Sequence, residues 1–133
     1  MIAATELRLV VVTPETTLVD KVVKSLRFPL FDGQIGVLPN RAPLVGRLGV
    51  GELKIETAEG SESFFIEGGF AQVKGSIVTL LTSRAVAGEK IDTEAAEKEL
   101  EAAQVMVPTT DEEFAAKQNM LTRSRGMLAI KKR

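Results

Sequence analysis

The chain has 133 residues, a formal net charge of −1 at pH 7, and neither cysteine nor histidine. Without cysteine it has no disulfide framework and no cysteine-bound zinc, and without histidine it lacks the commonest general base and metal ligand. This length fits one domain, or one domain with an appendage. The near-zero charge gives no general attraction to nucleic acid, so we expect no nucleic-acid partner, no metal and no cofactor.

Residues 1–6 (MIAATE) lack the basic stretch and apolar core of a secretory signal. No apolar run of the chain approaches the roughly 20 residues needed to span a bilayer. We therefore expect a soluble protein without direct lipid contact, whose membrane association comes through a partner.

The first two thirds of the chain has the pattern of short β-strands separated by turns. Strands are expected over residues 7–13, 19–28, 52–57, 63–67, 70–73 and 77–82. The segment 52–57 alternates cleanly, with Leu53 and Ile55 on one face. Short strands at this spacing predict an antiparallel β-sandwich of about ten strands over residues 1–87.

Residues 31–45 (FDGQIGVLPNRAPLV) combine a glycine turn, a short apolar run and two prolines. Gly33 and Gly36 can adopt positive φ at little cost, and Pro39 and Pro43 fix φ and remove a backbone donor. This combination favours a tight, rigid loop that reaches the surface, rather than a catalytic pocket.

After Gly88 the periodicity becomes helical. Asp92 is the expected N-cap of a first helix that ends at Pro108. The apolar stripe of this helix is Ala96, Leu100, Ala103 and Val107. Together with a second helix, it predicts an α-helical hairpin over residues 88–133.

The second helix is expected over residues 111–130. Thr110 and Glu113 have the spacing of a capping box, with Thr110 as the N-cap. Apolar residues suited to an antiparallel partner recur every seven positions, at Phe114, Leu121 and Leu128.

The predicted hairpin is polarised in charge. Residues 89–113 hold nine acids and two bases, whereas residues 114–133 hold six bases and no acid. Helix dipoles favour acids at helix starts and bases at helix ends, which is one interpretation. The other is that the basic end docks on an acidic partner surface, and both can hold.

Docking of this hairpin on the sandwich is expected to be weak. Its faces are rich in alanine, which buries little apolar area at about 25 cal/mol per Å². Gly126 costs the second helix about 1 kcal/mol relative to alanine. Weak docking fits an element with two arrangements close in energy, and it also fits a frayed appendage.

Residues 31–45 resemble the G-x-x-G-V-L-P-x-H-A-P-L segment of the epsilon subunit of F-type ATP synthases. Three further segments are similar to this family in order and spacing: residues 12–14 (VTP), 68–73 (GGFAQV) and 91–92 (ID). The resemblance covers the whole chain and implies a β-sandwich followed by a helical hairpin. It also implies a rotor subunit of the proton-translocating enzyme, without catalytic residues of its own.

The resemblance implies that one face of the sandwich binds the gamma subunit and that bottom loops contact the membrane c-ring. Asp32, Gln34 and Arg41 fall on the loop that faces the ring in relatives, and solvated turn residues are the alternative interpretation. Arg41 stands where histidine is common, so a contact that relies on imidazole would differ here. The apolar residues of this loop are expected in the core: Ile35, Val37 and Leu38.

In relatives the hairpin is a regulatory switch. Folded on the sandwich it permits hydrolysis, and extended beside gamma it enters the catalytic alpha/beta hexamer and blocks rotation in the hydrolysing direction. The candidate contacts to the acidic end of the beta subunit are Arg123, Arg125, Lys131, Lys132 and Arg133. A hairpin that only stiffens the stalk is the other interpretation.

Some relatives bind ATP in the hairpin through an Ile/Leu-Asp-x-x-Arg-Ala motif. Here Ala95 stands at the arginine position, beside the negative charge of Glu94. A phosphate site without its arginine loses a bidentate, charge-assisted partner. The remaining nucleotide candidates are Ile91 and Asp92, and we predict weak or absent ATP binding.

The family places the protein peripherally at the cytoplasmic face of a bacterial inner membrane or, for a plastid relative, at the stromal face of the thylakoid. The two alternative classes of function are a small-molecule-binding sandwich and an enzyme. A small-molecule-binding sandwich lacks support, because the chain has no glycine-rich phosphate loop. An enzyme would need acid–base pairs such as Glu52/Glu56 or Glu62/Glu67, which fit solvated strand faces better.

Overall fold

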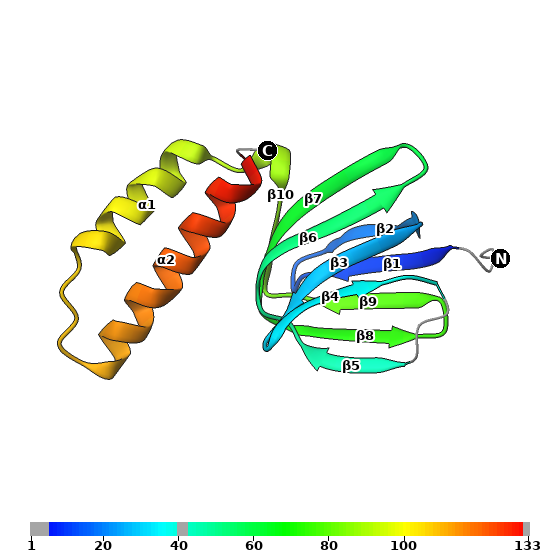
Figure 1. The fold of residues 1–133 in the computed structure, drawn as a ribbon, viewed down its shortest axis with the longest axis horizontal. Helices are drawn as coiled ribbons and strands as arrows, with labels where there is room; N and C mark the ends of the chain where they lie inside the picture. Colours follow the sequence, from blue (N-terminus) through cyan, green and yellow to red (C-terminus); the bar gives the residue numbers. More distant parts are fainter. Residues whose placement is uncertain (1–5, 40–42, 132–133) are drawn as a thin grey trace.

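The computed structural model describes residues 6–39 and 43–131 and consists of two stacked five-stranded sheets followed by two helices (Figure 1). Sheet A has the order β2-β1-β9-β8-β5, and its strands are Thr17–Val23, Leu7–Val12, Ile77–Leu81, Phe70–Lys74 and Leu44–Arg47. Sheet B has the order β10-β7-β6-β3-β4, and its strands are Arg84–Ala87, Gly60–Glu67, Val50–Thr57, Ser25–Leu30 and Gly33–Val37. Among the described strands, β1 and β9 pair in parallel and the other pairs are antiparallel. The predicted sandwich with a helical hairpin is confirmed.

The single strand expected over residues 19–28 is wrong, because the chain crosses between the sheets at Lys24. β2 pairs with β1 in sheet A, and the Lys24 N–H then donates to the carbonyl of Glu56 in sheet B. Pro29 lies inside β3 instead of ending it. Proline is tolerated there because the β3–β6 ladder already stops at Arg27, so no ladder donor is lost.

The main core lies between the sheets and contains the inward-facing residues of both. Leu53 and Ile55 are fully buried, as their alternation predicts. Of the loop residues expected in the core, Val37 is buried and Ile35 packs against the core. Leu38 is 66% exposed, so that prediction is wrong. It directly follows the inward-facing Val37, and successive side chains of an extended segment point to opposite faces.

A short 3₁₀ turn, Gly88–Lys90, leads into α1, which spans Thr93–Val105. The predicted cap is confirmed, because the Asp92 carboxylate accepts a hydrogen bond from the Ala95 N–H at 3.1 Å. Ala96 and Ala103 are buried as expected. Val107 is 82% exposed, because α1 ends before it.

Helix α2 spans Asp111–Lys131. The Thr110 hydroxyl accepts from the Glu113 N–H at 3.1 Å, which confirms this cap. The Glu113 carboxylate instead accepts from the Thr109 N–H at 2.7 Å and hydroxyl at 2.8 Å, one residue earlier than a capping box. Phe114 is exposed, whereas Leu121 and Leu128 are buried. Figure 1 gives the reason: the α1–α2 connection points away from the sandwich, whereas α2 contacts β6, β7 and the 3₁₀ turn.

Candidate functional site

One end of the sandwich carries part of the predicted ring-facing set. Asp32 lies in the turn between β3 and β4, Gln34 lies in β4, and both are exposed. Arg41 lies outside the described residues. Beside them Phe31 is 72% exposed, and the Arg47 guanidinium lies 4.9 Å from the centre of its ring. Sequence reasoning missed this cation–π pair, because Arg47 belongs to another strand.

The outer face of sheet A is open and carries a group of apolar side chains among polar ones. Strand register places Val12 beside Leu81, Leu81 beside Phe70, and Phe70 beside Arg47. The sheet A face comprises the exposed apolar residues Leu18, Val22, Val45, Phe70, Ile77 and Leu81. An exposed apolar patch of this kind marks an interaction site in soluble proteins. The available sequence signal was the apolar run in β1 and β9, which lacks the polar alternation of a half-exposed strand.

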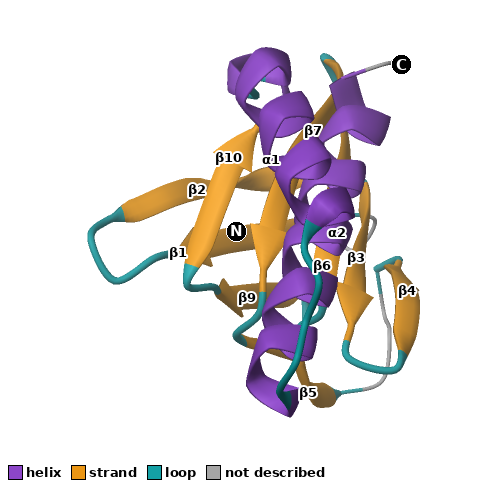
Figure 2. Ribbon diagram, turned by 90° about the vertical axis from the view of Figure 1, so that its left-hand side faces the viewer, coloured by secondary structure: helices purple, strands orange, loops and turns teal. Residues whose placement is uncertain are grey.

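The hairpin covers the outer face of sheet B. Phe65 of β7 is fully buried there, between the inward-facing Phe64 and Ile66. It shares a second core with residues of the hairpin: Ile91, Ala96, Met127, Leu128 and Ile130. Figure 2 shows α2 lying across β6 in this face. The contact between hairpin and sandwich therefore contains more large apolar side chains than the alanine-rich helix sequences predicted.

Arg123 joins three elements by ion pairs. Its Nε lies 2.8 Å from an oxygen of Glu67 on β7, and its Nη1 lies 2.5 Å from an oxygen of Glu99 on α1. Burial alone lowers the pKa of Arg123, but the charges and hydrogen bonds of the two carboxylates outweigh it, so this pKa is raised. Arg123, the first of the predicted contacts to a partner subunit, is thus already paired with two acids of its own chain.

The other predicted hairpin contacts lie differently. Arg125 is exposed on α2. Lys131 is also exposed, and its Nζ donates to the carbonyl of Glu89 at 2.9 Å. Lys132 and Arg133 lie outside the described residues. Of the nucleotide candidates, Ile91 is buried in the second core and Asp92 caps α1, so each has a structural role.

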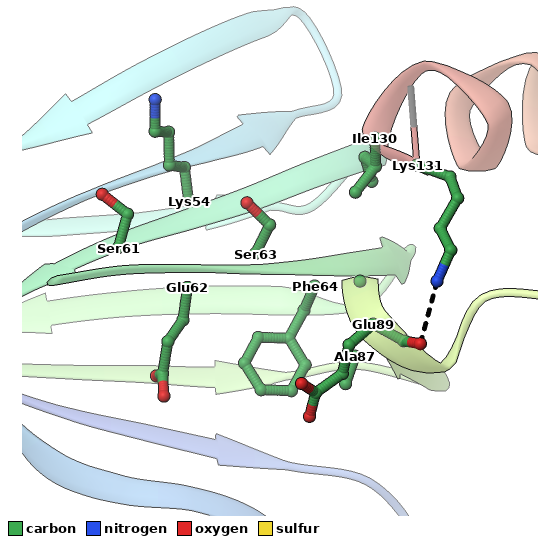
Figure 3. Close-up of a pocket in the computed structure, with 10 residues that line it drawn as sticks. Lys54, Ser61, Glu62, Ser63, Phe64, Ala87, Glu89, Ile130 and Lys131 are labelled. Atoms are coloured by element: carbon green, nitrogen blue, oxygen red, sulfur yellow. Dashed lines mark hydrogen bonds between the residues drawn. The ribbon is translucent and has the colours of Figure 1, made fainter. Parts of the chain in front are cut away.

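An open pocket of about 660 Å³ lies where the end of α2 meets β7 (Figure 3). Lys54, Ser61, Ser63 and Lys131 contribute its polar lining. The serine hydroxyls donate to carboxylates of the neighbouring strand, Ser61 to Glu56 at 2.6 Å and Ser63 to Glu52 at 2.7 Å. The two serines are therefore engaged in strand-to-strand bonds instead of converging on the space.

The acids considered for acid–base chemistry each have a hydrogen-bond or ion-pair partner. Glu52 and Glu56 accept from serines, Glu62 pairs with Lys21, and Glu67 pairs with Arg123. In the described part of the chain, no group of three or more acids is placed to hold a metal ion. Within the same residues, no helix is long and apolar enough to cross a membrane.

Comparisons with known proteins agree on one family. The family model described as "ATP synthase, Delta/Epsilon chain, beta-sandwich domain" matches residues 6–88. An ATP synthase epsilon chain from Rhodopirellula baltica is 43% identical, with 92% of this chain and 95% of the relative covered. A sodium-ion-specific ATP synthase epsilon chain from Propionigenium modestum is 35% identical, with 72% and 70% covered.

Solved structures show the same architecture. A chain in the OSCP/F1/c-ring assembly of the Euglena gracilis mitochondrial ATP synthase superposes with a TM-score of 0.86 at 25% identity, covering 94% of this chain and 81% of that one. A chain from the central stalk and c-ring of the Tetrahymena thermophila enzyme shares the fold, with a TM-score of 0.72 at 13% identity and 94% and 96% covered. With a matching family model over most of its length and a relative similar along nearly all of it, the chain belongs to the epsilon-subunit family of F-type ATP synthases.

Proposed function

We propose that this chain is a noncatalytic subunit of the central stalk, which couples rotation of a proton-driven c-ring to the gamma subunit. The observation that carries the proposal is that the two outer faces of the sandwich differ. The hairpin covers the outer face of sheet B, whereas the sheet A face is exposed and apolar. A stalk subunit needs such a permanent docking face in addition to an element that can move.

The sheet A face is the proposed gamma contact, because burial of its apolar side chains would supply affinity. Asp32, Gln34 and Arg41 remain the candidates for polar contact with the ring. This arrangement keeps the protein peripheral, at the cytoplasmic face of a bacterial inner membrane. The bacterial relatives favour that location over a thylakoid.

The hairpin is the proposed brake on ATP hydrolysis. Helix α2 has 21 residues and is therefore about 30 Å long, enough to reach into the hexamer from the stalk. Release from sheet B would free Arg123 from Glu67 and present it together with Arg125 and Lys131 to an acidic surface. Several charges must act together, because one exposed ion pair contributes little.

The test is ATP hydrolysis by a cognate alpha/beta hexamer with gamma, with either the full chain or a version truncated after Gly88 added. Cosedimentation confirms that each version binds. Binding by both versions, with inhibition by the full chain alone, is the expected result. If both bind and neither inhibits, the hairpin has a structural role, and if neither binds, the stalk assignment is wrong.

A further inference from the structure

The contact between hairpin and sandwich contains a charged cluster beside the apolar residues of the second core. The Arg123 side chain is 27% exposed, and those of Glu67 and Glu99 are 20% and 25% exposed. The same Oε1 atom of Glu67 that lies 2.8 Å from Arg123 also lies 3.6 Å from Nη1 of Arg84. Glu67 therefore stands between two arginines, one on the hairpin and one on the sandwich.

The two arginines lie on different parts of the molecule, so they respond differently when the hairpin leaves sheet B. Arg84 lies opposite Glu67 in the β10–β7 ladder, so it stays beside Glu67 whether or not the hairpin is docked. Arg123 lies on α2 and leaves Glu67 when the hairpin leaves sheet B. Its bond to Glu99 lies within the hairpin and survives if α1 and α2 move together.

Geometry explains why an arginine occupies this position. The Nε and Nη1 atoms of one planar guanidinium each contact a different carboxylate, one on β7 and one on α1. Lysine offers a single point charge on a flexible stem and could not hold both in the same way. The carboxylates are largely shielded from water, so salt screens this cluster less than a fully exposed pair.

We propose that Arg123 is an electrostatic clasp that sets the balance between docked and released hairpin, and that Arg84 takes over Glu67 on release. The proposal rests on the proposed function in that the hairpin must be able to leave sheet B. Glu67 and an acidic partner therefore compete for Arg123, because its guanidinium cannot pair with both at the same time. Arg84 lowers the cost of release by leaving Glu67 with a cation in the released state.

The experiment uses the full chain, whose lack of cysteine allows site-specific labelling. Cysteines introduced at the exposed positions Glu59, in the turn between β6 and β7, and Gln104 carry a donor and an acceptor dye, which report the separation of sandwich and hairpin. The released fraction is measured for the free chain and for the chain bound to the gamma-containing hexamer. Circular dichroism confirms that each variant keeps its helices.

Arg123→Gln and Glu67→Gln are expected to raise the released fraction about threefold or more, the effect of losing one partly buried ion pair. The double variant should release no more than the stronger single one, because both remove the same interaction. Arg125→Gln is the matched control in the free chain, an exposed arginine two residues further along α2, and should leave the released fraction of the free chain unchanged. Arg84→Gln should lower the released fraction, because Glu67 then depends on Arg123 alone.

The proposal is overturned if, in the free chain, Arg123→Gln leaves the released fraction equal to that of Arg125→Gln. It is equally overturned if Arg84→Gln releases the hairpin as Arg123→Gln does. Hydrolysis measured on the same samples separates this proposal from the proposed function. Glu67→Gln releases the hairpin with every basic residue intact, so stronger inhibition supports both, whereas release without any inhibition supports the clasp and refutes the brake.

Discussion

Gly126 of α2 lies directly against the ring of Phe65 of β7. A Cβ atom added to Gly126 would lie 2.7 Å from Cε1 of that ring, closer than carbon atoms pack. Phe65 is fully buried, so its ring cannot move aside without disturbing the second core. The glycine that weakens α2 as a helix is thus the residue that lets α2 approach the sheet.

Replacement Gly126→Ala should therefore strengthen the helix and weaken its docking. Alanine favours an isolated helix by about 1 kcal/mol. Overpacking against Phe65 should cost the docked state about 1–3 kcal/mol. The separation of the dyes described above, together with hydrogen exchange of α2 amides, measures the loss of docking. Thr122→Ala is the control, since Thr122 is exposed and gains helix propensity alone; equal docking in the two variants would contradict the prediction.

Local signals predicted local structure well. The alternation that buries Leu53 and the cap at Asp92 involve neighbours in the chain, and both are confirmed. Contacts between distant segments were not predictable in this way. Arg123 pairs with Glu67, 56 residues away, and nothing in its own helix distinguishes it from Arg125.

The same limit applies to the outer faces of the sheets. A strand pattern indicates which residues alternate, but not whether a helix covers the outward side. Phe65 is buried because the hairpin lies over it, whereas Phe70 of sheet A is exposed because no described element does. The sheet A face could therefore be recognised as the candidate gamma contact only when the structure showed which sheet the hairpin covers.

A charge placed on the sheet A face should abolish gamma binding and leave the fold intact. Val45 is 75% exposed in β5, so Val45→Asp removes no core contact. Burial of the new carboxylate in a protein interface would cost several kcal/mol, which should weaken binding by about a hundredfold or more. Cosedimentation with a gamma-containing hexamer measures the affinity.

The matched control for that variant is Val105→Asp. Val105 is 78% exposed at the end of α1, so it is the same residue type with similar exposure, on the hairpin instead of the sandwich. It should bind as tightly as the unaltered chain. Loss of binding in both variants, or in neither, would remove the sheet A face as the gamma contact.

Acid should loosen the connection between the helices. The backbone N–H of Thr109, followed by its hydroxyl, donates to the Glu113 carboxylate and lowers the pKa of Glu113 from its ordinary 4.5. A depressed carboxyl pKa contributes stability that is fully present above the ordinary value and is lost as the pH falls through the folded value. The Thr109 amide shift in NMR should therefore titrate below pH 4.5.

Two variants make that titration specific. Glu113→Gln retains an acceptor oxygen but has no carboxyl group to protonate, so the Thr109 amide should become insensitive to acid. Glu112→Gln removes an adjacent exposed acid and should leave the titration unchanged. A Thr109 titration that persists in Glu113→Gln would show that another group is responsible.

Truncation after Gly88 should leave a folded sandwich, which tests the predicted boundary between residues 1–87 and 88–133. The core between the sheets consists of residues from Leu7 to Ala85 and contains no described hairpin residue. The truncated chain should unfold cooperatively but self-associate, because it exposes Phe65. Phe65→Ser should restore a monomer in gel filtration of the truncated chain, and in the full chain the same change should release the hairpin.

Nucleotide binding gives the last prediction, because Ala95 can be returned to the residue that ATP-binding relatives carry. Ala95 is exposed on the first turn of α1, so Ala95→Arg introduces no clash. A site with a dissociation constant one hundredth of the ATP concentration would stabilise the folded chain by about 2.7 kcal/mol. The unaltered chain should show no such shift in thermal unfolding at millimolar ATP, whereas Ala95→Arg should show a larger shift than the unaltered chain. A clear shift in the unaltered chain would mean that the hairpin holds phosphate by groups other than this arginine. The exposed basic residues in the last two turns of α2, Arg125 and Lys131, would be the first to replace.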